Sequence, residues 1–330
     1  MHDFEQLFNT IAGLKVAVVG DVMLDTYWWG RVDRISPEAP VPVVSLQKKE
    51  YRLGGASNVA LNTVALQAYT TLFSVVGDDD NAAILLNMLE KQHIDTQYII
   101  KSPERITTSK TRVISRNQQM MRLDDEITTD ISTGSEEQLF ANFVTYINTS
   151  APDVVIFEDY NKGVLTESFI TNIITICRQR GIITSVDPKR KNFFAYKGVT
   201  IFKPNLKEVK DGLNMLLADV TIGSLNIVHQ QLYDALGHNI SLITLSEKGV
   251  FVQDEHQSFI LPTHQRNITD VSGAGDTVIA VASLVYAATQ HIKLAAAMAN
   301  LAGGLVCEEV GTAALDASRL LHECNASLGG

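Results

Sequence analysis

The chain has 330 residues, of which 45% are hydrophobic and 19% are charged, with 21 glycines and 8 prolines. This is the composition of a globular protein, and it excludes a disordered, collagen-like or low-complexity chain. The formal net charge of −10 argues against a broad surface for nucleic acid or anionic lipid, because both ligands are themselves negatively charged.

Short apolar runs alternate with helical patterns along most of the chain, which predicts βαβ units around a mostly parallel sheet. The runs are almost continuously apolar, as strands covered on both faces should be. They occupy residues 15–19, 72–76, 154–157, 182–186, 200–202 and 242–245. The helical patterns occupy residues 56–67, 80–92, 135–148, 166–180, 222–236, 274–289 and 293–307. The predicted fold class is α/β, with helices flanking the sheet.

Two regions interrupt this alternation. Residues 27–52 and 107–123 read as extended polar and β-branched segments without long helices. We interpret them as a small β-sheet that is inserted into the main domain and can act as a lid. Because no internal repeat or long linker divides the chain, residues 1–330 are expected to form a single domain.

The sequence also bears on the compartment. The N-terminus lacks the basic and apolar regions of a signal peptide, and the most apolar stretch, residues 277–292, is shorter than a bilayer requires. Three cysteines, Cys177, Cys307 and Cys324, lack the paired spacing of a zinc or redox motif. We expect idle thiols and a cytoplasmic protein without a membrane or nucleic-acid partner.

Polar residues follow the carboxyl ends of several predicted strands. They include Asp21, residues 78–80, Glu158, Asp159 and Asp187. Open α/β sheets bind their ligands at this edge, so the sequence predicts a ligand site there.

Residues 270–277, Asp-Val-Ser-Gly-Ala-Gly-Asp-Thr, directly precede a long apolar helical pattern. Glycines let backbone N–H groups approach a phosphate, and a helix N-terminus adds partial positive charge. Asp276 could then accept the proton of an attacking hydroxyl during phosphoryl transfer, with Gly273, Ala274 and Gly275 holding the moving group. From these residues alone, a helix cap with a tight turn is an equally good interpretation.

A second group of residues suits a sugar acceptor. Asp21 and Asp25 follow the first strand, and carboxylates accept pairs of hydrogen bonds from hydroxyls. Gly54 and Gly55 precede Asn58, where glycines permit close approach of a ligand and the amide can both donate and accept. The plain alternative is a glycine turn before an ordinary helix start.

Asn205 and Glu208 lie three residues apart directly after a strand, so they share one face of a first helical turn. An amide and a carboxylate so placed suit the ordering of phosphates and of a metal-bound water. The same spacing also makes a helix cap with a glutamate at the third helical position.

Basic residues gather in residues 101–122 against an acidic background. On a lid, Lys110, Arg112 and Arg122 would recognise an anionic group, such as a phosphate already present on the acceptor. Solvent-facing charges that protect an edge strand from aggregation are the alternative.

The segment 270–276, together with the helix that follows it, resembles the C-terminal signature of the ribokinase-like (PfkB) carbohydrate kinases, and residues 54–60 resemble their N-terminal signature. The resemblance implies a ribokinase-like fold, ATP and Mg²⁺ as cofactors, and Asp276 as the catalytic base. It also implies that the sugar is held by Asp21, Gly54, Gly55 and Asn58, with Asp25 as a further candidate.

The same resemblance assigns further residues. The stretch 158–163 is similar to a segment found in part of the family, which implies Asp159 near the metal or phosphate and Lys162 near an anionic substrate; a loop with a surface ion pair is the alternative. Mg²⁺ would be held, mostly through water, by Asn205, Glu208 and Asp159. Asp270 and Ser272 match two contributors to a monovalent-cation site, which makes K⁺ a further candidate. The expected ATP-binding residues are Asn205, Leu206, Lys207, Glu208, Ser246, Gly249, Gly273, Gly275 and Asn300.

Within the family, the resemblance is to the kinase part of bacterial ADP-heptose synthesis proteins, and it covers residues 19–25, 34–43, 54–60, 112–119, 122–124 and 270–277. This implies phosphorylation of the C1 hydroxyl of D-glycero-D-manno-heptose 7-phosphate to the 1,7-bisphosphate, for ADP-heptose and lipopolysaccharide core biosynthesis. No His-x-Gly-His motif of a nucleotidyltransferase domain occurs in the sequence, so only the kinase step is expected.

Two other functions stay open. One is a kinase for another sugar phosphate, and the other is a non-catalytic sugar or nucleotide sensor that retains the fold. A dinucleotide-binding dehydrogenase is disfavoured, because no Gly-x-Gly-x-x-Gly follows a predicted strand. Lids of this type commonly pair between subunits, so a homodimer through the lid is expected.

Overall fold

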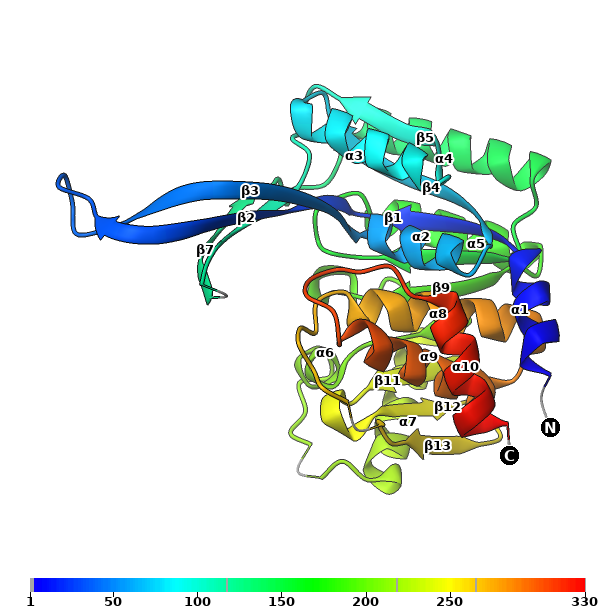
Figure 1. Cartoon of the computed structure of the whole chain (residues 1–330). Helices are drawn as coiled ribbons and strands as arrows, with labels where there is room; N and C mark the ends of the chain where they lie inside the picture. The colour runs from blue at the N-terminus through cyan, green and yellow to red at the C-terminus, as the bar shows by residue number, and fades with distance from the viewer. Residues whose placement is uncertain (1–2, 117, 218, 265, 330) are drawn as a thin grey trace.

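A nine-stranded sheet runs through the centre of the protein (Figure 1). The structure, a computed structural model, describes residues 3–116, 118–217, 219–264 and 266–329. All neighbouring strands are parallel except the pairs that involve β12, which is antiparallel to both its neighbours. In spatial order the strands are β13 (Ser258–Leu261), β12 (Val250–Gln253), β11 (Ile240–Thr244), β10 (Ile201–Phe202), β9 (Ile183–Asp187), β8 (Val154–Glu158), β1 (Lys15–Gly20), β4 (Tyr69–Gly77) and β5 (Asp95–Ser102).

The apolar strands divide their side chains between two cores, one on each face of the sheet. In β1, Val16 and Val18 belong to one core, whereas Ala17 and Val19 belong to the other, and all four are fully buried. Because successive side chains of a strand point to opposite faces, a continuously apolar run is what a doubly covered strand needs.

Helices cover both faces of the sheet. One core is formed with α1 (Phe4–Ala12), α2 (Ala56–Ala65), α3 (Asp80–Lys91), α8 (Ala274–Thr289), α9 (Ile292–Val306) and α10 (Ala317–Leu328). The other core is formed with α4 (Thr133–Thr149), α5 (Glu167–Gln179), α6 (Leu206–Gly212) and α7 (Ile222–Leu236). Two short 3₁₀ helices, η1 (Arg190–Asn192) and η2 (Ser246–Lys248), lie in connections.

Helix α8 is unusual, because its residues 276–285 are all buried. An α-helix that is apolar on every side belongs in the interior, and here it packs against α2 and α9. Its first turn is therefore held rigidly.

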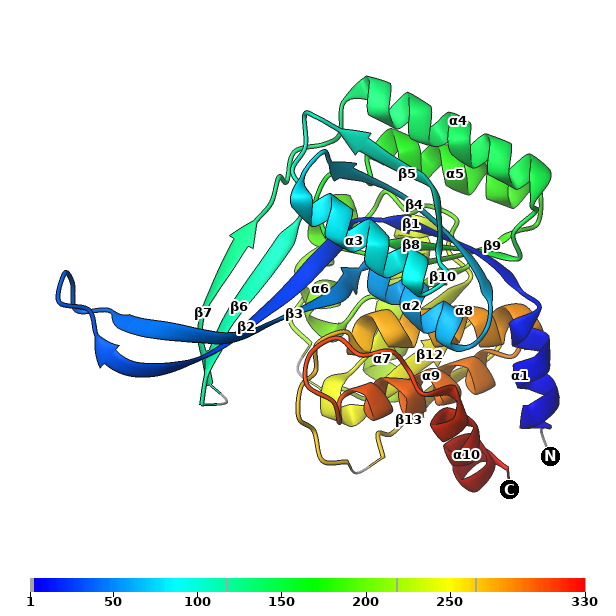
Figure 2. The ribbon, with the colours of Figure 1, turned by 45° about the horizontal axis from the view of Figure 1, so that its top comes forward.

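A second sheet projects from the main body and forms the lid (Figure 2). Strand β2 pairs antiparallel with β3 and parallel with β6, and β6 pairs antiparallel with β7. The near end of β2 is buried and its far end is exposed. In spatial order the lid strands are β3 (Pro42–Gly55), β2 (Val22–Ile35), β6 (Ser109–Ser115) and β7 (Gln118–Asp125).

The predicted α/β class, with a mostly parallel sheet, flanking helices and a small lid sheet, is confirmed. Every predicted strand and helix overlaps an observed one. The lid strands β2 and β3 extend beyond the predicted segment 27–52 into the main body, and residue 117 of the predicted segment 107–123 lies outside the described residues.

The sequence patterns missed α1, α10, β5, β12 and β13, and they indicated only the first turn of α6. Helix α6 is short, and β13 is only half-buried along its whole length, so neither has a strong apolar period. The three cysteines are buried free thiols, as predicted. Among the described residues, no helix combines the length and apolar character needed to cross a bilayer.

Candidate active site

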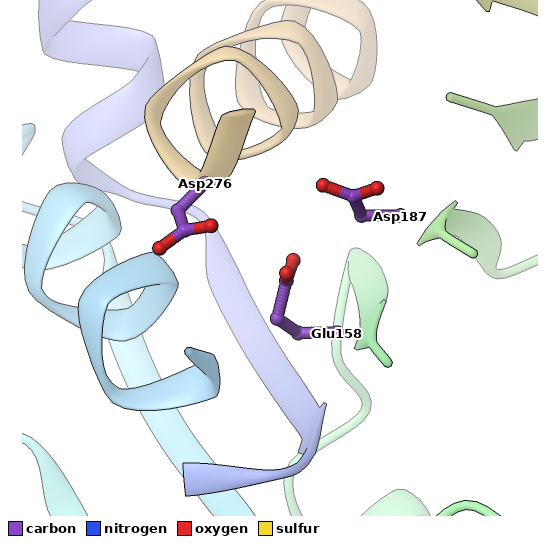
Figure 3. A group of neighbouring side chains, drawn as sticks. All are labelled: Glu158, Asp187 and Asp276. Carbon is purple, nitrogen blue, oxygen red and sulfur yellow. The ribbon is translucent and has the colours of Figure 1, made fainter. Parts of the chain in front are cut away.

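Three acidic side chains meet at the carboxyl edge of the central sheet (Figure 3). Glu158 ends β8 and Asp187 ends β9, and the register of these strands pairs the two residues. Asp276 reaches them from the first turn of α8. One carboxylate oxygen of each residue lies within 4.8 Å of the others, and all three residues are buried. We call these residues the acidic cluster.

Glu158 is the most exceptional member of the acidic cluster. Both of its carboxylate oxygens are buried and make no hydrogen bond with any residue that the structure describes. Burial, and then the negative charges of Asp187 and Asp276, raise the pKa of Glu158 well above its ordinary value. A buried carboxylate without a partner is costly unless a proton or a cation neutralises it. The residues present therefore fit a hard divalent cation such as Mg²⁺, which prefers carboxylate oxygens.

Two lysines partly balance the acidic cluster. The buried ammonium of Lys203 lies 2.8 Å from Asp187, and the ammonium of Lys189 lies 3.3 Å from Asp187 and 2.8 Å from Glu208. Burial raises the pKa of Asp187, but Lys189 and Lys203 outweigh burial and hold that pKa below its usual value. Asp187 is therefore ionised at neutral pH.

The carboxylate of Asp276 is held on both oxygens. The amide of Asn58 donates to Oδ2 at 2.8 Å, and the hydroxyl of Tyr160 donates to Oδ1 at 2.9 Å. Burial raises the pKa of Asp276 above its ordinary value, and the charge of Asp187 adds to this, although Asn58 and Tyr160 act in the opposite direction. A fixed carboxylate with a raised pKa is well suited to accept a proton.

The start of α8 forms a place for an anion beside Asp276. Gly273 is the N-cap residue and adopts a left-handed conformation, with a φ of 79°. A Cβ atom added to Gly273 would lie 2.7 Å from Nδ2 of Asn58, so only glycine allows both the turn and this approach. The first N–H groups of a helix have no partner inside it, and the helix dipole attracts negative charge. Lys203 adds a cation at the start of the helix. Its Nζ lies close to Gly275, since a Cβ atom added to that glycine would be 3.6 Å from it.

The predicted acceptor residues surround the same position. Gly54 and Gly55 end β3, directly before α2 with Asn58. A Cβ atom on Gly54 would lie 3.2 Å from Cγ of Asp25, and one on Gly55 would lie 3.5 Å from the ring of Tyr160. The structure therefore brings these predicted residues together on one side of Asp276.

Asp21 has an observed role as an anchor. Its buried carboxylate accepts hydrogen bonds from the backbone N–H groups of Tyr160 at 2.9 Å, Lys162 at 3.0 Å and Val164 at 3.1 Å. Burial raises its pKa in spite of these bonds. Asp21 thus shapes the loop that carries Tyr160, and few of its lone pairs are left for the sugar that the sequence predicts.

Arg112 is the lid cation nearest to these acceptor residues. It lies on β6 and forms an ion pair with Asp25 on β2. The guanidinium group also lies over the ring of Tyr27, 5.2 Å from its centroid. Its positive charge helps to lower the pKa of Asp270. Arg112 therefore lies between the root of the lid and the turn that begins at Asp270.

The other predicted lid cations are paired with acids. Lys110 lies 3.1 Å and Lys162 lies 2.8 Å from Glu126, so the structure brings these two lysines together. Arg122 instead pairs with Asp124 on the exposed strand β7. Arg122 nevertheless lies directly opposite Arg112 in the register of β6 and β7, and its partner Asp124 also lies 3.3 Å from Lys110. Its contact with an anionic acceptor stays a prediction.

Asn205 and Glu208 form a complete capping box at the start of α6. Oδ1 of Asn205 accepts the N–H of Glu208, and Oε2 of Glu208 accepts the N–H of Asn205, both at 2.8 Å. Oε1 of Glu208 also pairs with Lys189, which reaches the acidic cluster. The helix cap is therefore present, and Lys189, which pairs with both Glu208 and Asp187, links it to the acidic cluster.

Comparison with known proteins decides the class. Residues 14–318 match the model of the pfkB family of carbohydrate kinases. The chain belongs to this family. It is therefore a phosphotransferase, as predicted, and pfkB kinases use ATP with Mg²⁺ and a sugar acceptor.

This pfkB kinase is similar to two proteins named bifunctional protein HldE. It is 37% identical to that of Geobacter metallireducens over 321 residues, and 43% identical to that of Chromohalobacter salexigens over 309 residues. The matches cover 96% and 93% of this chain but 64% and 62% of those proteins. The chain thus spans less than two thirds of the length of these relatives.

Solved structures share the fold. Phosphofructokinase-2 from Escherichia coli in complex with potassium aligns with a TM-score of 0.78 at 15% identity, over 96% of this chain and 100% of that one. Ribokinase from Arabidopsis thaliana complexed with ribose and ATP aligns with a TM-score of 0.72 at 16% identity, over 94% and 99% of the chains. The predicted ribokinase-like fold is confirmed.

Within the pfkB kinase, the carboxylate of Asp159 is fixed by three hydrogen bonds. Its carboxylate accepts hydrogen bonds from the backbone of Asn161 at 2.8 Å, from Asn192 at 3.2 Å and from Tyr196 at 2.7 Å. Burial raises its pKa to about 6. The adjacent Glu158, rather than Asp159, contributes its carboxylate to the acidic cluster. The predicted place of Asp159 near the metal or phosphate stays a prediction.

Several predicted nucleotide residues lie around the ends of β11 and α9. Ser246 is exposed in η2, and Gly249 follows η2 with a φ of 94°. Asn300 in α9 donates from its amide to the carbonyl of Pro262 at 2.8 Å. Leu206 and Lys207 open α6. Their contacts with ATP stay predictions.

Asp270 and Ser272 shape the turn before α8. The carboxylate of Asp270 accepts the N–H and the hydroxyl of Ser272 at 2.9 and 2.8 Å, and the N–H of Gly311 at 2.8 Å. Burial raises the pKa of Asp270, but these bonds outweigh it and keep that pKa low. The K⁺ site predicted from these two residues stays a prediction.

The sequence did not assign four of the residues that adjoin Asp276: Glu158, Asp187, Lys203 and Tyr160. Glu158 and Asp187 carried a signal, since both stand at the ends of predicted strands. Tyr160 lies in the stretch 158–163 that resembles a family segment, but nothing local indicated its hydrogen bond with Asp276. The ion pair of Lys203 with Asp187 likewise had no local signal.

Proposed function

We propose that this pfkB kinase transfers the γ-phosphoryl group of ATP to the C1 hydroxyl of D-glycero-D-manno-heptose 7-phosphate, and that the product is the 1,7-bisphosphate for ADP-heptose and lipopolysaccharide core biosynthesis. The similarity to the HldE proteins supports this acceptor. So does the resemblance to the kinase part of ADP-heptose synthesis proteins, which covers residues 19–25, 34–43, 54–60, 112–119, 122–124 and 270–277.

One observation carries the proposal of a phosphorylated acceptor. Arg112 lies at the root of the lid and pairs with Asp25, which packs beside Gly54 on the acceptor side of Asp276. A phosphate on the acceptor would compete for this guanidinium through charge-assisted, bidentate hydrogen bonds. Lys110 and Lys162, which share Glu126, are the further cations of the same region.

The mechanism follows from the groups around Asp276. Its carboxylate takes the proton of the C1 hydroxyl as that oxygen attacks the γ-phosphorus, and the bond to the β-phosphate oxygen breaks to release ADP. Asn58 and Tyr160 hold the carboxylate in place for this step. The first N–H groups of α8 and the ammonium of Lys203 stabilise the negative charge on the moving group.

Cations complete the site. Glu158 and Asp187 would hold Mg²⁺, with Asn205 and Glu208 acting mostly through water, and the ion supplies positive charge that offsets the charge of the phosphates. For K⁺ we propose the turn of Asp270 and Ser272. A structure of Escherichia coli phosphofructokinase-2, which shares the fold, contains potassium.

We further propose that two copies of the chain pair through the lid. Its strands expose apolar side chains. A large exposed apolar patch on a protein usually marks a place where a partner binds. Light scattering of the wild type and of a Leu46→Glu, Leu123→Glu variant tests this, with a dimer and a monomer expected, respectively. A monomeric wild type contradicts the pairing. The exposed apolar residues of the lid are Ile35, Val41, Leu46, Met120, Met121 and Leu123.

The decisive experiment is an ATP-dependent assay with heptose 7-phosphate that detects the bisphosphate by mass spectrometry. A panel should include the unphosphorylated heptose and ketohexose phosphates. We expect the heptose phosphate to give the highest kcat/KM. Preference for an unphosphorylated sugar would contradict the proposed role of Arg112 in binding a phosphate. Preference for another sugar phosphate would show that the heptose phosphate is not the acceptor. A failure to consume ATP with any acceptor would favour a sensor.

A further inference from the structure

A groove of about 580 Å³ lies between α5 and the segment 190–197, which follows β9. Its volume is within the range of small-molecule sites. None of the residues that line it belongs to the candidate active site. We call it the α5 groove.

The α5 groove is positively charged. Its lining holds four cations, Arg178, Arg190, Lys191 and Lys197, and one acid, Glu167. This composition is notable in a chain with a net charge of −10. The average composition of an acidic protein does not by itself explain four cations around one groove.

These cations differ from those of the lid in their pairing. Lys191 pairs with Asp130, but Arg178, Arg190 and Lys197 form no ion pair with any residue in the described part of the chain. In the lid, by contrast, Lys110 and Arg112 both have acidic partners. The α5 groove therefore offers charge that the protein itself leaves available for an anion.

Two features suit a phosphate joined to a ring. A Cβ atom on Gly198 would lie 2.8 Å from Nη1 of Arg178, so glycine allows this guanidinium to lie directly against the backbone. Phe194, at the same groove, is 40% exposed although it is a large apolar side chain. Guanidinium groups bind phosphate oxygens in pairs, and aromatic faces stack on nucleobases.

The groove is also built on a fixed support. Asn192 and Tyr196, from the same segment, bind the buried carboxylate of Asp159, and Phe193 packs edge-on against Phe202 in the core. A segment anchored in this way loses little further freedom when a ligand binds.

We propose that the α5 groove is a second binding site, separate from the candidate active site, for a small molecule that carries a diphosphate group. Arg178, Arg190 and Lys197 hold the phosphates. A nucleoside diphosphate and inorganic pyrophosphate share this chemistry, and Phe194 distinguishes them because only the nucleotide has a ring to stack on it.

Isothermal titration of the full chain with ADP and Mg²⁺ tests this proposal. We expect two ADP sites in the wild type. In an Arg190→Ala, Lys197→Ala variant, the affinity of the groove for ADP should fall by about tenfold or more, so that the other site dominates the titration. The matched control, Lys91→Ala with Lys101→Ala, removes two exposed lysines elsewhere and should keep both sites. A single ADP site in the wild type, or an unchanged second site in the Arg190→Ala, Lys197→Ala variant, overturns the proposal.

Titration with inorganic pyrophosphate separates the two ligand sources. A groove site for pyrophosphate that is as strong as the site for ADP, and is lost in the Arg190→Ala, Lys197→Ala variant, assigns the groove to the diphosphate alone. Stronger binding of ADP that falls in a Phe194→Ala variant assigns it to a nucleotide. The kinase assay on the same variants checks that the main site is intact, since none of these residues belongs to it.

Discussion

The acidic cluster and the lid handle charge in opposite ways. In the cluster, Glu158 is buried without a partner and Asp276 is held between two neutral donors. In the lid, Arg112 and Lys110 are less buried and each has an acidic partner. A cation that binds at the cluster therefore removes the free-energy cost of burying an unpartnered carboxylate. An anion that binds at the lid must instead displace an existing ion pair. We expect changes in the cluster to affect chemistry, and changes in the lid to affect acceptor binding.

The largest effect should come from Asp276→Asn. The amide cannot take the proton of the acceptor hydroxyl, so kcat should fall by about 10²–10⁴-fold. Thermal unfolding should be unchanged or slightly raised, because a buried charge is removed. Steady-state kinetics and circular dichroism check both parts. Turnover close to that of the wild type would show that Asp276 is not the base.

Arg112→Ala should affect the binding of the acceptor at the lid. Loss of the guanidinium should raise KM for the phosphorylated acceptor by about 10–100-fold, the range of a charge-assisted hydrogen bond, with a smaller effect on kcat. Arg31→Ala is the matched control: it also removes a lid arginine, but one whose exposed ion pair with Asp33, on the outer half of β2, should matter by about twofold or less. Equal effects of the two variants would contradict a special role for Arg112.

Glu158→Gln should separate stability from function within the cluster. The amide removes a metal ligand, so the Mg²⁺ concentration needed for half-maximal rate should rise by about tenfold. The free energy of unfolding should nevertheless increase, because the neutral amide needs neither a buried charge nor the uptake of a proton.

The sign of the pH dependence follows from the raised pKa of Glu158. The folded wild type holds this proton more tightly than the unfolded chain, so its stability falls as the pH rises above the ordinary glutamate value. Glu158→Gln removes that loss, and its gain in melting temperature should be larger at pH 8 than at pH 5. Glu104→Gln, at an exposed position, is the control and should show no such trend. A variant less stable than the wild type at both pH values would contradict the expectation.

The smallest effect should come from Tyr160→Phe. The hydroxyl lowers the pKa of Asp276, so its removal should move the acid limb of the kcat profile to higher pH, with a loss of activity of only a few-fold at about neutral pH. Tyr233→Phe, a change at an exposed tyrosine, serves as the control. An unshifted profile would mean that Tyr160 does not act on the base.

Much of the fold was predictable because its signals are local. The apolar strands and the glycine turn before Asp276 can be recognised within a few residues of sequence. Strand β13 was missed and helix α6 was predicted only as a first turn, because both are short and have few buried side chains and therefore show no clear period in the sequence.

The site was predictable only in part, for physical reasons. The spacing of Asn205 and Glu208 fits a helix cap and a metal site equally well, and sequence cannot choose between them. The choice of Glu158 over Asp159 depends on the direction of single side chains at a strand end. The ion pair of Lys203 with Asp187 joins the ends of two strands, so it exists only once the sheet has formed.

Strand β2 has a consequence for the mechanics of the lid. Its pairing with β3 shifts register between Trp29 and Gly30, and a side chain at Gly30 would strike Val44 and Ser45. The inner half of β2, with Asp25, is buried, whereas the outer half is largely exposed. A flexure at this bulge would let the outer half of the hairpin bend under load while Asp25 and Arg112 keep their positions. The buried inner half of the lid can thus keep its shape while the outer half moves.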